Sequence, residues 1–221
     1  MVVASRLEFR YPLWYMITTI PITEKDILES TLEVLKKGGV IVYPTETCYG
    51  LGCDATNEEA VERIFKIKER EKNKPVLVIA ENKEKFFEYV EWNETIEELT
   101  RAYWPGALTI VASLKERASH TLAKGVIGSG GTIAFRVTSH PFAARLAQEL
   151  GRPLVSTSAN LSSYPNPYDI KYVTSMFEGG EVVPDLIINA GDLSHQSPST
   201  IVQVDAEGNK KVLRQGEIVI S

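Results

Sequence analysis

Residues 40–80 read VIVYPTETCYGLGCDATNEEAVERIFKIKEREKNKPVLVIA, and this stretch decides the fold class. The β-branched run at 40–43 predicts a short buried strand. Asn57 is a suitable cap for a helix that we expect to run to about Arg70, and the apolar run at 75–80 predicts a second buried strand. Strand, helix and strand within forty residues are typical of an α/β domain.

The same patterns extend to the rest of the chain. Helices are expected at 23–37, 83–90, 95–103, 141–150 and 169–177, and strands at 108–114, 132–137, 154–156, 186–188, 199–204 and 211–213. Because these elements alternate irregularly, they favour an α/β domain with a mixed sheet over a regular doubly wound one. No repeat or linker divides the chain, so we expect an N-terminal extension at 1–15 and one domain at 16–221.

The composition is that of an ordinary globular protein, with 43% hydrophobic and 24% charged residues in 221. This excludes a disordered chain, a collagen and a coiled coil. The net charge of -5 argues against a protein that grips a nucleic-acid backbone along much of its surface. Cys48 and Cys53 match neither a disulfide framework nor a zinc pattern, which favours a reducing cytoplasm. No apolar run approaches the roughly 20 residues of a membrane span.

A dense basic segment follows the helix that begins after Asn57. Lys68 falls close to the apolar stripe of that helix, where a lone lysine is most often a side chain that snorkels to solvent. The density of charge favours a different interpretation, because five cations lie within nine residues of an acidic protein: Lys66, Lys68, Arg70, Lys72 and Lys74. Cations at a helix C-terminus suit a phosphate-bearing ligand.

Two polar loops and two arginines are further candidates for a site. The loops at 44–52 and 156–160 each follow an apolar strand, which is where α/β sheets bind ligands, although each could equally be an ordinary turn. Arg136 and Arg214 lie in or next to predicted strands. Each is either a surface residue or a side chain placed to fork onto a carboxylate or a phosphate.

Together these segments resemble the YrdC-like threonylcarbamoyl-AMP synthases. The motifs that carry the resemblance occur in family order from about residue 20 to the C-terminus: YPTETCYGLGCDA (43–55), KIKEREKNKP (66–75), WPGALT (104–109), TIAFRVTSHP (132–141), STSAN (156–160), PSTIV (198–202) and VLRQG (212–216). The resemblance implies a YrdC-like α/β fold, which is a twisted, mixed and largely open sheet with flanking helices and a concave cationic cavity. The seven motifs together are specific for this family, whereas no single motif would be.

The resemblance also implies an activity. Such enzymes condense L-threonine, bicarbonate and ATP into threonylcarbamoyl-AMP and release diphosphate. A downstream tRNA threonylcarbamoyl transferase complex then modifies the adenosine next to the anticodon, so contact of this chain with tRNA would be weak or indirect. Mg²⁺ is expected with the triphosphate and needs no dedicated protein ligands. The chemistry requires no protein nucleophile, so Cys48 needs no covalent role.

The site residues are carried over by position from the family motifs. Lys68 and Arg70 would be catalytic. L-Threonine would be held by Thr47, Arg136, Ser156 and Ser199, with Arg136 forked onto its carboxylate. The nucleotide side would be lined by Arg70, Lys74, Thr132, Ser158, Asn160, Asn166 and Arg214. Ile79 stands where the family usually has a histidine, which puts an imidazole contact to threonine in doubt.

Two alternatives remain open on the sequence. A module of the same fold could take double-stranded RNA or tRNA by shape and phosphate contacts, against which the net charge of -5 weighs. A relative that forms a carbamoyl-adenylate could serve a different acceptor. Such relatives usually sit in longer chains that carry zinc fingers, and this chain lacks the cysteine pairs.

Overall fold

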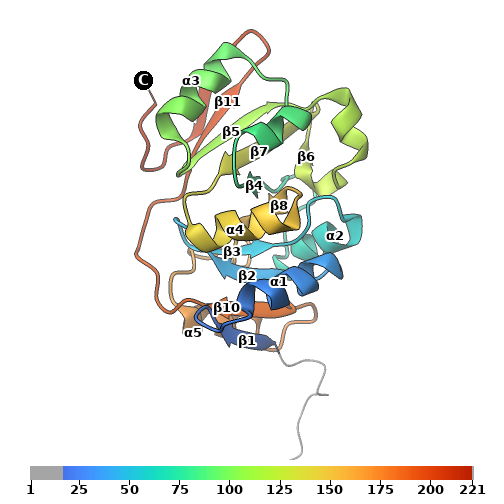
Figure 1. The fold of residues 1–221 in the computed structure, drawn as a ribbon, viewed down its shortest axis with the longest axis vertical. Coiled ribbons are helices and arrows are strands. Elements are labelled where there is room, and N and C mark those ends of the chain that lie inside the picture. The colour runs from blue at the N-terminus through green and yellow to red at the C-terminus, as the bar shows by residue number, and fades with distance from the viewer. Residues whose placement is uncertain (1–16, 221) are drawn as a thin grey trace, which may run out of the picture.

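The computed structural model describes residues 17–220, which form two mixed β-sheets, one above the other along the long axis of the molecule (Figure 1). The α/β class and the flanking helices are confirmed, but the single open sheet that we expected is two sheets. The predicted extension at 1–15 lies outside the described residues. None of the helices within 17–220 combines the length and the apolar character needed to cross a bilayer.

The lower sheet is built around the hairpin that contains the PTET motif. In spatial order it holds β1 (Thr18–Pro21), β10 (Leu186–Asn189), β2 (Ile41–Pro44), β3 (Tyr49–Gly52) and β9 (Thr157–Ser158). β10 pairs parallel with both β1 and β2, whereas β3 pairs antiparallel with both β2 and β9.

The upper sheet contains most of the strands that the apolar runs predicted. Its order is β12 (Lys210–Arg214), β11 (Thr200–Val204), β5 (Leu108–Ser113), β7 (Thr132–Val137), β4 (Val78–Ala80) and β8 (Leu154–Val155), with β6 (Ile127–Gly128) paired to β7. β8 leads through Ser156 directly into β9 of the lower sheet. The loop predicted at 156–160 therefore joins the two sheets.

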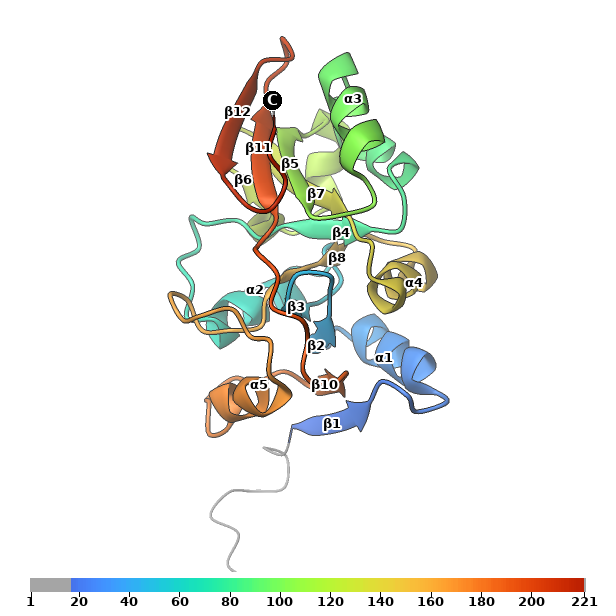
Figure 2. The same ribbon diagram turned by 90° about the vertical axis from the view of Figure 1, so that its left-hand side faces the viewer.

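Helices cover the sheets on two sides. Figure 2 shows α1 (Ile27–Lys36), α3 (Glu94–Tyr103) and α4 (Pro141–Leu150) on one side, and α2 (Glu58–Ile67) and α5 (Ile170–Phe177) on the other. Asn57 caps α2 as predicted, since its side chain accepts a hydrogen bond from the Ala60 N–H. Short 3₁₀ turns occupy η2 (Glu84–Glu88), η3 (Glu116–His120) and η4 (Lys124–Val126). The helix expected at 83–90 is the first of these turns.

The segment after Tyr43, which we expected to be a polar loop, is largely a β-hairpin. Pro44 remains in β2 and pairs with Tyr49, and Tyr43 pairs with Gly50. At the tip, the Thr45 hydroxyl accepts hydrogen bonds from the N–H groups of Thr47 and Cys48. The strand β3 escaped prediction because two of its four residues are glycines, which have low strand propensity.

Gly52 is required where β3 passes the link between the sheets. A Cβ at this position would lie 2.4 Å from the Val155 carbonyl oxygen and 2.7 Å from the Tyr43 ring. We expect Gly52→Ala to lower the free energy of unfolding by about 1–3 kcal/mol, because backbone and ring must move apart. Urea denaturation measures the loss. Gly180→Ala is the matched control, because its Cβ would meet no atom closer than 3.4 Å, and it should change stability by less than about 0.5 kcal/mol.

Candidate active site

An inner cavity of about 210 Å³ lies at the junction of the two sheets. It is lined by the β2–β3 hairpin, the link from β8 to β9, strands β5 and β7, and the segment before β11. Many of the predicted site residues line it, although they are far apart in the sequence: Thr47, Arg70, Arg136, Ser156, Ser158, Asn166, Ser199 and Arg214. Lys68, Lys74, Thr132 and Asn160 are not part of this lining.

Arg136 is the most informative residue of the cavity. Its side chain is only 3% exposed, so it is not the surface residue that the strand pattern allowed. Its Nε lies 3.4 Å from Glu46 Oε1, yet both atoms are buried without a hydrogen bond. A buried guanidinium with unused donors is costly. The Arg136 guanidinium is therefore a strong binding site for an anion. Because the guanidinium is planar and can donate two parallel hydrogen bonds, a carboxylate fits it best.

Arg214 also lines the inner cavity, beside Ser199. Its Nη2 donates to the Ser199 carbonyl (2.8 Å) and to Ser199 Oγ (3.1 Å), and Ser199 Oγ lies 2.8 Å from Thr109 Oγ1. Burial, and then the positive charge of Arg136, lowers the pKa of Arg214. Two guanidinium groups close enough to repel each other favour an anion bound between them.

Arg70 is the member of the basic segment that lines the cavity. Its guanidinium is fixed by hydrogen bonds to the carbonyl oxygens of Lys74 (2.8 Å) and Pro75 (3.3 Å), and burial lowers its pKa.

The other cations of the basic segment do not line the inner cavity. Lys72 pairs with Glu62 at 2.8 Å, and the Lys74 side chain is 60% exposed and pairs with Glu71 at 3.3 Å. Because α2 ends at Ile67, side chains beyond it do not follow one helical face.

Lys68 lies beneath the polar loop instead of facing the cavity. Its side chain is 1% exposed, and Nζ donates to the Ser158 carbonyl, the Asn160 carbonyl (2.7 Å) and Asn160 Oδ1 (2.9 Å). Burial, and then the charge of Arg70, lowers its pKa to about 7. All three N–H donors of the ammonium group are used on this loop, so Lys68 supports the loop in the free protein, and its contact with a phosphate stays a prediction.

Asn160 completes the anchor that Lys68 begins. Its Oδ1 accepts from Ser158 Oγ as well as from Lys68, and its Nδ2 donates to the carbonyl oxygens of Tyr164 (2.6 Å) and Pro165 (3.1 Å). Asn160 is therefore fully occupied within the loop and does not face the cavity. Its contacts hold the turn that brings Asn166 into the lining.

Several lining residues were missed or left without a role. Thr45 and Thr109 belong to the motifs quoted above, and only the folded hairpin and strand show that they line the cavity. Cys48 also lines it, but burial raises the pKa of this thiol to about 11, so the thiol is protonated near neutral pH. Ile79 is fully buried in the apolar core, whereas Leu77 lines the cavity.

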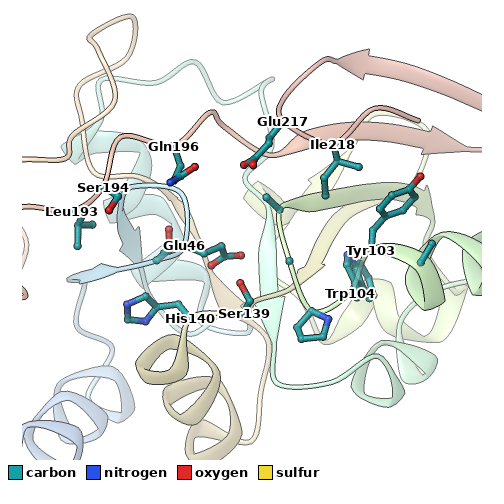
Figure 3. Close-up of a pocket in the computed structure, with 15 residues that line it drawn as sticks. Glu46, Tyr103, Trp104, Ser139, His140, Leu193, Ser194, Gln196, Glu217 and Ile218 are labelled. Atoms are coloured by element: carbon teal, nitrogen blue, oxygen red, sulfur yellow. The ribbon is translucent and has the colours of Figure 1, made fainter. Parts of the chain in front are cut away.

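An outer cavity of about 730 Å³ adjoins the inner one and shares Thr45 with it. Figure 3 shows Glu46 near its centre, with Glu217 reaching in from the C-terminal segment and with Ser139 and His140 nearby. Tyr103 and Trp104 line the opposite side. No lysine or arginine among the described residues lines this cavity. The two cavities thus differ in charge, with guanidinium groups in the inner one and carboxylates in the outer one.

Comparisons with known proteins agree with this architecture. The Sua5/YciO/YrdC family model, described as telomere recombination, matches residues 33–216. Proteins named threonylcarbamoyl-AMP synthase are 41% identical in Pseudoalteromonas translucida, over 70% of this chain and 82% of that protein, and 36% identical in Vibrio vulnificus, over 86% and 98%.

The structure of P. abyssi Sua5 complexed with L-threonine matches with a TM-score of 0.80 at 29% identity, over 91% of this chain. This chain spans 57% of the length of that protein. The family match covers the hairpin, the basic segment and the strands that surround the inner cavity. This chain belongs to the Sua5/YciO/YrdC family.

Proposed function

We propose that this chain is an L-threonylcarbamoyladenylate synthase, a nucleotidyltransferase that converts L-threonine, bicarbonate or CO₂, and ATP into threonylcarbamoyl-AMP and diphosphate. The observation that carries the proposal is the buried Arg136 guanidinium, which lines the inner cavity and uses none of its donors in a hydrogen bond with the described residues. Relatives with the corresponding name, and a family structure complexed with L-threonine, support the same substrate. Residues 16–221 would form the catalytic domain.

The amino acid would bind at the Arg136 end. Its carboxylate would take the guanidinium fork, and the hydroxyl groups of Thr47, Ser156 and Ser199 would receive the remaining polar atoms. A cavity of about 210 Å³ is smaller than the usual 300–1,000 Å³ of a ligand site. It therefore suits the reacting ends of the two substrates, and the rest of the nucleotide would lie outside it.

The triphosphate would bind to Arg70 and Arg214, with Ser158 and Asn166 adding polar contacts, and Arg214 would lie between the two substrates because it also contacts Ser199. Lys74 and Thr132, which the motifs also assign to the nucleotide, would have to contact the part of it that extends beyond the inner cavity. Mg²⁺ would neutralise phosphate charge when bound. Because no carboxylate lines the inner cavity in the described residues, it would be held by phosphate oxygens and water.

The reaction needs positioning and charge stabilisation instead of a protein nucleophile. The threonine amine adds to the bicarbonate carbon with loss of water, and the carbamate oxygen then attacks the α-phosphorus while the bond to the β-phosphate oxygen breaks. Arg70 and Arg214 would stabilise the charge that develops on the phosphoryl oxygens. The neutral Cys48 thiol agrees with a mechanism that forms no covalent enzyme intermediate.

The product would pass to a tRNA threonylcarbamoyl transferase complex, which modifies the adenosine next to the anticodon. We propose that tRNA contact with this chain is weak or indirect, because the net charge is -5 and much of the basic segment is paired with glutamates. The unpaired, buried cysteines Cys48 and Cys53 support a reducing, cytoplasmic setting.

The test is diphosphate release from ATP by the purified chain with L-threonine and bicarbonate present together or omitted one at a time. We expect release that requires both, with threonylcarbamoyl-AMP detected by mass spectrometry. L-Serine and L-valine in place of L-threonine serve as controls for the amino acid. Release that is the same without threonine would contradict the proposal, and tight binding of tRNA with a steep salt dependence would favour the RNA-binding alternative.

A further inference from the structure

We propose that Glu46 is a positioning residue that reserves Arg136 for a singly charged carboxylate and keeps the triphosphate away from the amino-acid end of the inner cavity. This inference rests on the proposed function and adds a residue that determines substrate placement. Glu46 stands at the tip of the β2–β3 hairpin, between the inner and the outer cavity. No substrate contact is assigned to it.

The geometry places Glu46 on one edge of the guanidinium. Oε1 lies 3.4 Å from Arg136 Nε, and Oε2 accepts a 2.6 Å hydrogen bond from Thr138 Oγ1. Thr138 is buried and lies two residues after Arg136 along the same extended segment, so its hydroxyl fixes the carboxylate relative to the guanidinium. Glu46 lines the outer cavity (Figure 3), whereas Arg136 lines the inner one.

Glu46 and Arg136 attract each other by charge, and Arg136 donates no hydrogen bond to Glu46. Glu46 Oε1 and Arg136 Nε are both buried without a hydrogen bond, although they are within ion-pair distance. Because Glu46 approaches the Nε side, the Nη groups of Arg136 remain for a ligand carboxylate. Glu46 therefore orients the Arg136 guanidinium and leaves its two Nη groups free to bind a carboxylate.

The pair also divides the inner cavity electrostatically. Glu46 offsets the charge of Arg136, whereas in the described residues no carboxylate lies within ion-pair distance of Arg70 or Arg214. L-Threonine is a zwitterion with one carboxylate, so it suits Arg136, whose charge Glu46 partly offsets. A polyanionic triphosphate gains most beside Arg70 and Arg214, whose charges no carboxylate of the described residues offsets by an ion pair. Without Glu46, the three arginines would attract phosphate across the whole cavity, and selectivity between the two ends would fall.

The experiment is steady-state kinetics of Glu46→Gln, which keeps the size of the side chain and removes its charge. We expect the KM for L-threonine to rise about ten-fold, and diphosphate to compete with threonine about ten-fold more strongly, while kcat at saturating threonine stays within about three-fold. Glu33→Gln is the control, because it removes a carboxylate that pairs with Lys37 on the protein surface and lines neither cavity. It should change none of these quantities.

Thr138 supplies a second and independent test. Thr138→Val removes the hydroxyl that holds the carboxylate and should reproduce the rise in the threonine KM, whereas Thr138→Ser keeps a hydroxyl and should restore the wild-type value. Isothermal titration calorimetry of L-threonine and of diphosphate measures the same change without turnover. If Glu46→Gln does not fold, Thr138→Val carries the test alone.

Two results would overturn the inference. One is an unchanged threonine KM and unchanged diphosphate competition in both the Glu46 and the Thr138 variants. The other is a fall in kcat with an unchanged threonine KM, which would mean that Glu46 acts in the chemical step. Failure of the proposed function looks different, because the wild-type chain would then release no diphosphate in response to threonine.

Discussion

Arg136→Met is expected to lower kcat/KM for L-threonine by about 100-fold to 10,000-fold. The reason is the loss of two charge-assisted hydrogen bonds to the substrate carboxylate, each worth about 1.5–3 kcal/mol in a buried site. Diphosphate release at a range of threonine concentrations measures the effect. Arg136→Lys keeps the charge but not the fork, so it should recover only a small part of the activity.

Arg136→Met should also destabilise the fold, because it leaves the buried Oε1 of the partly buried Glu46 carboxylate without its ion partner. Breaking a buried pair in this way costs about 3–5 kcal/mol. The double variant Arg136→Met with Glu46→Gln should regain most of this stability and none of the activity, which separates binding from folding. Arg101→Met is the surface control, since that side chain is 76% exposed. Wild-type threonine kinetics in the double variant would refute the role of Arg136.

Lys68→Met is expected to lower threonine-dependent diphosphate release by at least about 100-fold, through the loop that carries Ser158 and Asn166. The substitution keeps a long side chain but removes the donors that reach the two carbonyl oxygens and Asn160 Oδ1. A buried acceptor that loses its donor costs about 1–3 kcal/mol. Activity assays and the thermal midpoint of unfolding measure the two consequences.

Amide hydrogen exchange decides how Lys68 acts. If Lys68 anchors the loop, residues 156–166 should exchange faster in Lys68→Met than in the wild type, with substrate absent. If Lys68 moves to contact a phosphate, as the family motif implied, activity should fall while exchange in the free protein stays unchanged. Lys66→Met is the matched control, because Lys66 is exposed on the last turn of the same helix. It should alter neither activity nor exchange.

Arg136 and Lys68 are both buried cations, but we predict different roles for them. Arg136 lines the cavity and donates no hydrogen bond to the described residues, so its burial points to a ligand. Lys68 has used all three donors on the protein, so its burial points to support of a loop. The sequence pattern drew attention to both residues. It did not distinguish them, because the number of free donors depends on contacts between segments about ninety residues apart.

Local patterns in the chain were sufficient for the fold class, for most helices and strands, and for the motifs that supply the inner cavity. Apolar periodicity and capping act over a few residues, so the α2 cap at Asn57 and the strand β7 at 132–137 follow from neighbouring side chains alone. Long-range packing determined the rest. The strand β3 forms because its two glycines let the backbone lie close to Tyr43 and to the link between the sheets, a contact that no local pattern encodes.

The same distinction applies to the site. Side-chain chemistry and motif order were enough to nominate Arg70, Arg136 and Ser199, which the fold brings to one cavity. They were not enough to place Lys68 and Lys74, because α2 ends at Ile67 and the direction of each later side chain depends on which carbonyl or carboxylate lies opposite. Glu46 went unnoticed for a related reason. Its partners Arg136 and Thr138 lie about ninety residues away, and only sheet packing brings their charges and hydroxyl together.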